Sequence, residues 1–502
     1  MYKKVFCWVV FLLFLAGCSY PALAPASPDL DTATAILPDS PLLGTASPPA
    51  TAPANSASAV SPTSPPTIPL EPVAALHGIH IHGVESMTAE ILGQSNVKWT
   101  RLDDFNWDLI EPVKTDPPTY DWSAVDEEYL RIASDNGVEV VSLIQFAPEW
   151  AQKYPGYACG PIAADAIDDF ANFARELVSR YSQPPFNVDY WEVGNEPDID
   201  YTIVPPRSGF GCWGEAGDPY YGGGYYAEVL KAVYPQIKAV DPEAQVLVGG
   251  LLLDCDPVSP PETQAGSGEY KDCTPSKFLE GILNNGGGDS FDGVSFHAYD
   301  YYAASLGKYS NPNWHSSWDT TGPVVVSKSR YLKSVLNAFG YQDKFLINTE
   351  SALLCGQDGR EDFCQTDEFA ITKAGYLSQS YAAARAEGLR ANIWYSLKGW
   401  RGSGLVQSNL QPYLAFQAFG FSAGVLREAV YSGEITAYPG IKGYEFVQDG
   451  ARTWLVWALD EESHSLQLQD QPSAIYDVVG NPLPVSQEIN VTLIPLYIQW
   501  NP

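Results

Sequence analysis

Short β-rich runs alternate with helical stretches from residue 77 onward, and this alternation is the strongest constraint on the fold. Runs rich in β-branched and aromatic residues predict strands at 77–83, 97–103, 138–146, 188–194, 245–253, 292–297, 344–349 and 392–396. The segments between them have helical periodicity; between residues 167 and 181, for example, apolar residues recur on one face. Strands that alternate with helices form parallel sheets. Eight such units over about 350 residues predict an α/β fold, a (β/α)8 TIM barrel with enlarged loops.

A doubly wound sheet is the alternative for an alternating pattern, and it favours a glycine-rich phosphate turn after the first strand. The first strand instead leads into His80-Ile81-His82-Gly83, which is no such turn. After about residue 427 the pattern changes to short runs at 444–447, 453–457, 466–468 and 493–498, separated by turn residues. These runs predict a C-terminal all-β sandwich over 427–502, next to a barrel over 73–426.

The N-terminus has the pattern of an export signal. Lys3 and Lys4 precede an apolar run over 5–16, which is too short for a comfortable membrane span. The sequence Leu15-Ala16-Gly17-Cys18 resembles a bacterial lipoprotein signal, which implies a signal peptide over 1–18 and lipidation of Cys18; an ordinary signal peptide with a chance cysteine remains the alternative. Residues 19–72 are dominated by Pro, Ala, Ser and Thr and are expected to form a disordered tether.

Charge and hydropathy exclude two classes of protein. The chain has 28 Lys and Arg against 60 Asp and Glu, a formal net charge of −32, which opposes nucleic-acid binding. Only the first 20 or so residues contain an apolar run, which excludes a polytopic membrane protein. We therefore expect an extracytoplasmic protein that meets the membrane of a bacterial cell envelope only through its N-terminal lipid anchor.

Six of the eight cysteines follow the predicted lipidation site, and an even number in an exported protein argues for disulfides. Six cysteines permit 15 connectivities. Short closures favour Cys255 with Cys273 and Cys355 with Cys364, which leaves Cys159 to pair with Cys212. No Cys-x-x-Cys or His-x-x-x-His spacing occurs, so a zinc site is not expected.

Two predicted strands end in carboxylates. The fourth leads into Trp191-Glu192-Val193-Gly194-Asn195-Glu196-Pro197, and the seventh into Ile347-Asn348-Thr349-Glu350. In a (β/α)8 barrel the C-terminal ends of the strands carry the functional groups. Two opposed carboxylates are what cleavage of a glycosidic bond requires, one as the acid and the other as nucleophile or base.

These motifs resemble those of the retaining glycoside hydrolases of clan A, and in particular family 39 and its relatives. Besides the Asn195-Glu196-Pro197 motif and Glu350, the resemblance includes the segments 100–102, 107–112, 147–151 and 296–299, and it covers nearly all of residues 77–500. It implies a catalytic barrel with an attached β-sandwich.

The resemblance also implies roles for individual residues. Glu196 would be the general acid/base and Glu350 the nucleophile, with about 5–5.5 Å between the carboxyl groups. Further substrate-binding or supporting roles fall on Asn195, Arg101, His297, Tyr299, Trp394, His82 and Trp150. Asn195 would bind the sugar 2-hydroxyl, Arg101 and Tyr299 would favour the ionised form of Glu350, and Trp394 would be the platform under the sugar. For His82 a structural role and for Trp150 a packing role remain open.

The function expected is therefore a retaining glycosidase acting on a β-linked oligo- or polysaccharide and displayed on the cell envelope. The alternatives are a non-catalytic glycan-binding lipoprotein on the same scaffold, since fold does not fix function, and a transglycosylase that uses the same residues. The mechanism requires no metal ion or organic cofactor. We expect a carbohydrate substrate and a monomer; the sugar, the linkage and the choice between exo- and endo-action are left open.

Overall fold

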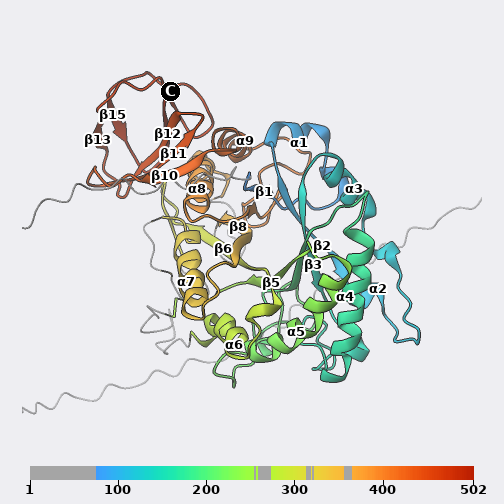
Figure 1. The fold of residues 1–502 in the computed structure, drawn as a ribbon. Coiled ribbons are helices and arrows are strands. Elements are labelled where there is room, and N and C mark those ends of the chain that lie inside the picture. Colours follow the sequence, from blue (N-terminus) through green and yellow to red (C-terminus); the bar gives the residue numbers. More distant parts are fainter. Residues whose placement is uncertain (1–74, 254–255, 258–272, 312–317, 319–321, 356–363) are drawn as a thin grey trace, which may run out of the picture. The chain divides into compact units, whose positions relative to one another are not determined.

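The computed structural model describes residues 75–253, 256–257, 273–311, 318, 322–355 and 364–502 (Figure 1). The predicted signal peptide, the tether and the lipidation site at Cys18 lie outside the described residues. Within the described residues, no helix is both long enough and apolar enough to cross a membrane.

Eight parallel strands close into a barrel, which confirms the predicted α/β fold (Figure 1). They are β1 (His77–Ile79), β2 (Trp99–Asn106), β3 (Glu139–Gln145), β4 (Tyr190–Asn195), β5 (Gln245–Leu251), β6 (Gly293–Tyr302), β8 (Phe345–Leu354) and β9 (Asn392–Trp394). Neighbouring strands pair in chain order, β5 pairs with β6, and β9 returns to β1 to close the ring. Strands β6 and β8 run five residues beyond their predicted ends, and the extension of β6 pairs with the short antiparallel β7 (Tyr309–Ser310).

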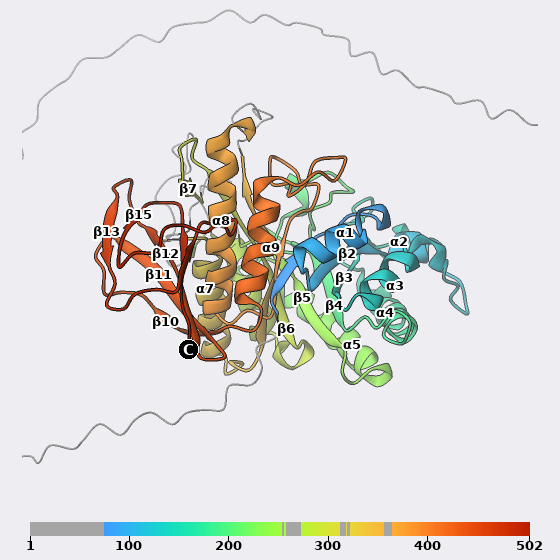
Figure 2. The same ribbon diagram turned by 90° about the horizontal axis from the view of Figure 1, so that it is seen from above.

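Helices on the outside of the barrel connect its strands (Figure 1). They are α1 (Ala89–Ser95), α2 (Trp107–Ile110), α3 (Glu127–Asp135), α4 (Ile167–Tyr181), α5 (Gly223–Val240), α6 (Phe278–Asn284), α7 (Val325–Ala338), α8 (Asp367–Ala386) and α9 (Leu414–Leu426). The side chains of Thr88, Asp126 and Thr366 accept backbone hydrogen bonds at the starts of α1, α3 and α8, which fixes where those helices begin. Figure 2 shows α7, α8 and α9 running side by side.

The barrel interior is built in layers, because side chains alternate across a strand. Trp99, Val141, Leu247, Ile347 and Ile393 form a buried apolar cluster from five of the strands. Nearer the C-terminal ends of the strands, a polar layer follows. Its members are Arg101 on β2, Glu192 on β4, Ser295 on β6 and Thr349 on β8, all buried. The apolar layer thus closes the barrel below, and the polar layer supports the groups at the C-terminal ends of the strands.

Two antiparallel sheets follow α9, which confirms the predicted C-terminal all-β region. The larger sheet consists of β10 (Val430–Glu434), β11 (Ile441–Gln448), β12 (Ala451–Ala458), β16 (Leu496–Trp500) and β14 (Ala474–Tyr476), in that order. The smaller is a ribbon of β13 (His464–Gln467) and β15 (Glu488–Val491). Tyr444, Phe446, Leu455, Trp457 and Tyr497 on one face of the larger sheet belong to the same buried core as the barrel.

Two disulfides occur in the described residues, Cys159–Cys212 and Cys355–Cys364, both as expected. The third expected pair includes Cys255, which lies outside the described residues. The Cys159–Cys212 bond joins the loop after β3 to the loop after β4, because Cys159 lies between β3 and α4 and Cys212 lies between β4 and α5. Disulfides persist in oxidising compartments, in agreement with an extracytoplasmic protein.

The two disulfides should stabilise the fold to different extents. The Cys159–Cys212 bond spans 53 residues and the Cys355–Cys364 bond spans 9. Since the entropy removed from the unfolded chain grows with loop length, the double variant C159S/C212S should lose about 1–2 kcal/mol more free energy of unfolding than C355S/C364S. Equilibrium urea unfolding of both variants measures this difference, and a larger loss from the shorter bond would contradict it.

Candidate active site

A β-bulge in β8 directs Glu350 into the barrel. Phe296 of β6 pairs with Asn348 and His297 pairs with Glu350, so Thr349 is an extra residue in the ladder. Thr349 already points inward in the polar layer, and strict alternation would turn the next side chain outward. The bulge re-aims that side chain, a common role of bulges beside active sites. Thr349 and Glu350 therefore both face the interior at the C-terminal end of β8.

The end of β4 breaks the alternation in another way. Gly194 has a φ of 77°, a conformation that glycine adopts without a steric cost. Glu196 itself has a φ of 39°, in the left-handed region that side chains other than glycine rarely adopt. Asn195 and Glu196 are consecutive, yet both reach groups of the barrel interior, as their contacts below show. A backbone held in such a conformation is typical of functional sites.

Arg101 connects the two strand ends that carry the carboxylates. Its guanidinium is 1% exposed and donates to Glu192 Oε2 at 2.6 Å, to Glu350 Oε1 at 2.6 Å and to Asn195 Oδ1 at 2.7 Å. Asp103, two residues further along β2, lies 3.8 Å from the same guanidinium. A buried guanidinium needs such partners, because an unpaired buried charge is costly.

Glu192 anchors this network from below. One of its oxygens accepts the Arg101 hydrogen bond, and the other accepts from the hydroxyls of Ser295 and Thr349. The residue is fully buried. The polar layer thus ties together β2, β4, β6 and β8 directly beneath the two carboxylates.

Glu196 and Glu350 face each other with different partners. The hydroxyl of Tyr299 donates to Glu350 Oε2, and Arg101 holds the other oxygen. Glu196 Oε1 lies 2.7 Å from His297 Nδ1, which lies 3.5 Å from Glu350 Oε2. One oxygen of each carboxylate and this nitrogen all lie within 4.8 Å of one another.

The surroundings of the two carboxyl groups favour different protonation states. Burial raises the pKa of Glu350 to about 7, while the charge of Arg101 and the hydrogen bond from Tyr299 act in the opposite direction. Burial and the negative charges of Glu350 and Asp198 raise the pKa of Glu196 well above its ordinary value. Arg101 and Tyr299 therefore favour the ionised form of Glu350, and the charge of Glu350 favours the protonated form of Glu196.

His297 remains neutral between them. Burial, together with the charges of Arg101 and Lys328, lowers the pKa of its imidazole well below the ordinary value. A neutral ring can donate through Nδ1 to Glu196 or accept the proton of Glu196 there, depending on its tautomer. Gly250 on β5 makes room for the ring, because a Cβ at this position would lie 2.2 Å from His297 Nε2.

The prediction that Trp394 lies under the sugar is wrong. Trp394 has no exposed surface, its ring packs against Tyr376 of α8, and its indole N–H donates to the Ser403 carbonyl oxygen at 2.8 Å. The reason is strand alternation: Ile393 points into the barrel, so the next side chain points outward to the helices. Tyr395 points inward again and is half-buried, with its ring centroid 6.4 Å from that of Tyr299.

The histidines after β1 lie beside Tyr395. His80 is buried and its Nε2 lies 3.4 Å from Asp103 Oδ2, while His82 is exposed with its ring 4.1 Å from that of His80. His80, His82 and Asp103 offer ligand atoms within 4.8 Å of one another, as do Glu196, His297 and Glu350. Both triads could hold a metal ion by donor type, but the Arg101 guanidinium contacts a carboxylate of each and opposes a further cation.

Trp150, in the short helix after β3, packs against residues outside the network of Arg101, Glu196 and Glu350. Its ring lies against Trp107 at 5.2 Å, its indole N–H donates to the Glu111 carbonyl oxygen, and Lys114 lies over its face. A contact of Trp150 with sugar therefore stays a prediction, as does one of His82.

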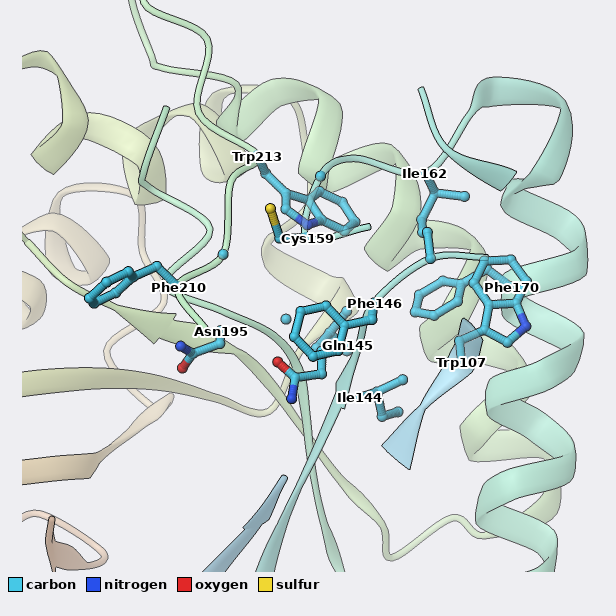
Figure 3. A pocket seen from close by; sticks show the side chains of 15 residues that line it. Trp107, Ile144, Gln145, Phe146, Cys159, Ile162, Phe170, Asn195, Phe210 and Trp213 are labelled. Atoms are coloured by element: carbon cyan, nitrogen blue, oxygen red, sulfur yellow. The ribbon is translucent and has the colours of Figure 1, made fainter. Parts of the chain in front are cut away.

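A small cavity lies behind Asn195, between the ends of β3 and β4 (Figure 3). Its lining includes Trp107, Phe146, Phe170 and Trp213, and its volume of about 20 Å³ holds roughly one water molecule. It is therefore no sugar site. The amide nitrogen of Asn195 donates to the Gly209 carbonyl oxygen at 2.9 Å and has a second N–H to offer.

Sequence reasoning missed Glu192 and Tyr395. Glu192 occurs within the motif that predicted Glu196, but four residues earlier, where the strand is still inside the barrel. For Tyr395 the signal was present, because alternation from Ile393 places it on the inner face. Of the predicted residues, Arg101, Asn195, Glu196, His297, Tyr299 and Glu350 are brought together in one connected network.

The fold resembles those of solved glycoside hydrolases. A family 39 glycoside hydrolase from the gut symbiont Bacteroides cellulosilyticus WH2 matches with a TM-score of 0.62 at 18% identity, over 85% of this chain and 81% of that chain. The family 39 enzyme from Xanthomonas axonopodis pv. citri matches at 0.52 and 14% identity, over 85% and 94%. A family 30 endoxylanase from Clostridium papyrosolvens C71 matches at 0.51 and 13% identity, over 82% and 92%.

At these identities the likeness establishes the fold, and at that level it confirms the predicted resemblance to clan A barrels of family 39 and its relatives. No protein-family model and no curated protein matches the sequence.

Removing the charge of the buried Glu192 carboxylate should destabilise the protein strongly. Glu192→Gln leaves the Arg101 guanidinium without one of its two close carboxylates, and we expect a loss of about 3 kcal/mol in the free energy of unfolding. The control is Glu461→Gln, whose exposed pair with Lys308 should contribute at most about 1 kcal/mol. Urea unfolding of both variants measures the losses; equal losses would show that Arg101 does not depend on Glu192.

Proposed function

We propose that the protein is a retaining glycoside hydrolase that cleaves the O-glycosidic bonds of a β-linked oligo- or polysaccharide by double displacement. The observation that carries this proposal is the pair of facing carboxylates with different partners. Glu350 accepts hydrogen bonds from a guanidinium and a phenol that favour its anion, whereas Glu196 contacts a neutral imidazole and its protonated form is favoured by burial and by the charges of Glu350 and Asp198. The glycoside hydrolases among the structural neighbours support the same reaction class.

The spacing of the carboxylates favours retention over inversion. Retaining enzymes place the two carboxyl groups about 5–5.5 Å apart, whereas inverting enzymes need about 6.5–9.5 Å to admit a water molecule. One oxygen of Glu196 lies within 4.8 Å of one oxygen of Glu350, a proximity that supports the shorter, retaining spacing. In the proposed mechanism Glu350 is the nucleophile and Glu196 the acid, as their different partners favour.

In the first step, ionised Glu350 attacks the anomeric carbon while Glu196 gives its proton to the glycosidic oxygen, and the leaving sugar departs as an alcohol. The Glu350 carboxylate becomes an ester, so its negative charge is lost. The pKa of Glu196, raised in part by that charge, then falls.

In the second step, Glu196 is a carboxylate and can take a proton from water. The water oxygen attacks the anomeric carbon, the ester bond to Glu350 breaks, and both groups return to their starting states. A sugar hydroxyl in place of water would give transglycosylation with the same residues. His297, neutral and in contact with Glu196, can orient that carboxyl group in both steps.

Substrate contacts are assigned to the groups that line the strand ends. The second N–H of Asn195 would bind the sugar 2-hydroxyl, a contact that strengthens in the transition state. Tyr395 takes the aromatic position first assigned to Trp394, and His82 is exposed beside it. The overall charge of −32 disfavours strongly anionic glycans.

The proposed location is the bacterial cell envelope. The signal over 1–18, the lipidation site at Cys18 and the Pro- and Ala-rich tether over 19–72 would hold a monomeric enzyme away from the membrane. The disulfide Cys159–Cys212 agrees with an oxidising environment.

The roles of the two carboxylates can be separated with one pair of variants. Glu350→Gln should abolish the release of reducing ends from plant and bacterial polysaccharides, since no nucleophile remains. Glu196→Ala should slow hydrolysis of sugars with poor leaving groups by about 10²–10⁴-fold, while activated aryl glycosides still react in the first step and added azide, in the space left by the carboxylate, restores turnover. Glu228→Gln, an exposed carboxylate on α5, is the matched control.

NMR of the first-formed product should show the anomeric configuration of the substrate, and the inverted anomer would exclude double displacement. Full activity of Glu350→Gln would refute the assignment of the nucleophile. Glycan binding by the wild type with no hydrolysis on the whole panel would favour the glycan-binding alternative.

Tyr299→Phe should shift the acidic side of the pH profile of kcat/KM. Activity requires ionised Glu350, so the rate falls as the pH drops through the pKa of Glu350. Without the phenol hydrogen bond this pKa rises, and the acidic side should move to higher pH, with a 10- to 100-fold lower rate near neutrality. Tyr302→Phe, at the end of the same strand, should leave the profile unchanged; an unshifted profile for Tyr299→Phe would contradict the role of the phenol.

A further inference from the structure

The larger C-terminal sheet has two faces with different surroundings. One face packs into the barrel core through Tyr444, Phe446, Leu455, Trp457 and Tyr497. On the other face a separate apolar cluster packs beneath the ribbon of β13 and β15. The ribbon does not cover this face completely, and the part left open carries a pocket.

The pocket has a volume of about 310 Å³, at the lower end of the range for small-molecule sites. Glu445 of β11 pairs with Trp454 of β12, and Arg452 of β12 pairs with Trp500 of β16. Paired residues lie on the same face, and so do residues two apart on one strand, so these four side chains form one surface. Tyr438, before β11, lines the same pocket.

The aromatic rings of the pocket are held in place by their polar ends. The Trp454 indole N–H donates to Glu445 at 2.6 Å, that of Trp500 donates to the Asp470 carbonyl oxygen at 3.3 Å, and the Tyr438 hydroxyl donates to a backbone oxygen. The two indole centroids lie 5.0 Å apart with an angle of 64° between the planes. Trp454 and Tyr438 are only half-buried, so ring surface remains for a ligand.

Polar groups surround these rings. The Arg452 guanidinium lies over the Trp500 ring at 4.2 Å and makes long ion pairs to Glu445 and Asp470, at 3.8 and 3.9 Å. Pairs at these distances leave its N–H groups able to donate to a ligand hydroxyl. The carboxylates of Glu445 and Asp470 thus face one guanidinium, and this excess of negative charge disfavours anions in the pocket.

Aromatic faces beside a mixed ring of donors and acceptors, with net negative charge, suit one class of ligand. A pyranose presents an apolar C–H face to an aromatic ring and hydroxyls at its edge to arginine and carboxylates. A uronic acid or a sugar phosphate would be repelled. We propose that this pocket binds a pyranose unit of a neutral glycan, as a second carbohydrate site on the sheet face opposite the barrel. The choice of polymer rests on the proposed function, since the natural ligand would be another stretch of the glycan that the barrel cleaves.

A second site of this kind acts through effective concentration. Once one stretch of a polymer occupies the sheet pocket, the next stretch is held near the barrel without a further encounter. Weak binding of single sugars is then sufficient to raise the affinity for a polymer. A short substrate gains nothing, because it cannot reach both sites at once.

The test uses the full chain with Glu350→Gln, so that no polymer is consumed, alone and combined with Trp454→Ala or Tyr438→Ala. Affinity electrophoresis in gels that contain xylan, mixed-linkage β-glucan or galactomannan measures polymer binding. For at least one polymer, we expect the pocket variants to bind about tenfold more weakly than the parent. Phe339→Ala, an exposed aromatic at the end of α7, is the matched control and should bind like the parent.

Two further measurements separate this proposal from the proposed function. In the active background, Trp454→Ala should keep kcat/KM on a short aryl glycoside within about twofold and lose kcat/KM on the polymer. The Trp454 indole N–H signal in NMR should shift on titration with xylose, glucose or mannose, whether or not the barrel is active. Equal polymer affinity of parent and pocket variants, or an unmoved Trp454 signal with all three sugars, would overturn the second site. Absence of hydrolysis without a change in these binding measurements would contradict only the proposed function of the barrel.

Discussion

The Arg101 guanidinium is the group on which the rest of the site depends. It is almost fully buried at the centre of the barrel and donates to Glu192, Glu350 and Asn195. One positive charge faces two carboxylates that need it, so the cluster already has an excess of negative charge. Ionising Glu196 would add another negative charge in a buried place, so the charge of Glu350 favours the protonated form of Glu196. This charge balance supports the proposed roles of Glu196 as the acid and Glu350 as the nucleophile.

The positions of the strands were predictable because they depend on local pattern. Runs of β-branched and aromatic residues located all eight barrel strands, and the carboxylates at two strand ends located the centre of the site. The bulge at Thr349 was not predictable, because the register of a ladder depends on the neighbouring strand. The error at Trp394 differs: counting from Ile393 would have assigned the inner face to Tyr395. Glu192 could not be assigned until its partners on three other strands were known.

Sequence reasoning predicted least about the structure of the loops around the site. The β4 loop runs from Asn195 to the start of α5, and its Cys212 is bound to Cys159 of the β3 loop. The backbone N–H of Cys212 also donates to the Cys159 carbonyl oxygen, so the two loops are cross-linked by a disulfide and a hydrogen bond. In a barrel enzyme such loops determine which substrates fit, whereas the strand ends determine the chemistry. In the proposed enzyme, the geometry of the strand ends would determine the reaction type, and these cross-linked loops would determine which glycan fits.

The two faces of the C-terminal sheet connect the structural and the binding role of this region. Its inner face shares a continuous core with the barrel, so the sheet cannot turn freely against the cleft. A pocket on its outer face is consequently held at a fixed reach from Glu350, which is the condition under which a second weak site raises the affinity for a polymer. A flexible linker would spread that reach over many distances and dilute the effect. The aromatic side chains of the inner face fix the sheet against the barrel, and this packing fixes the position of the aromatic pocket on the outer face.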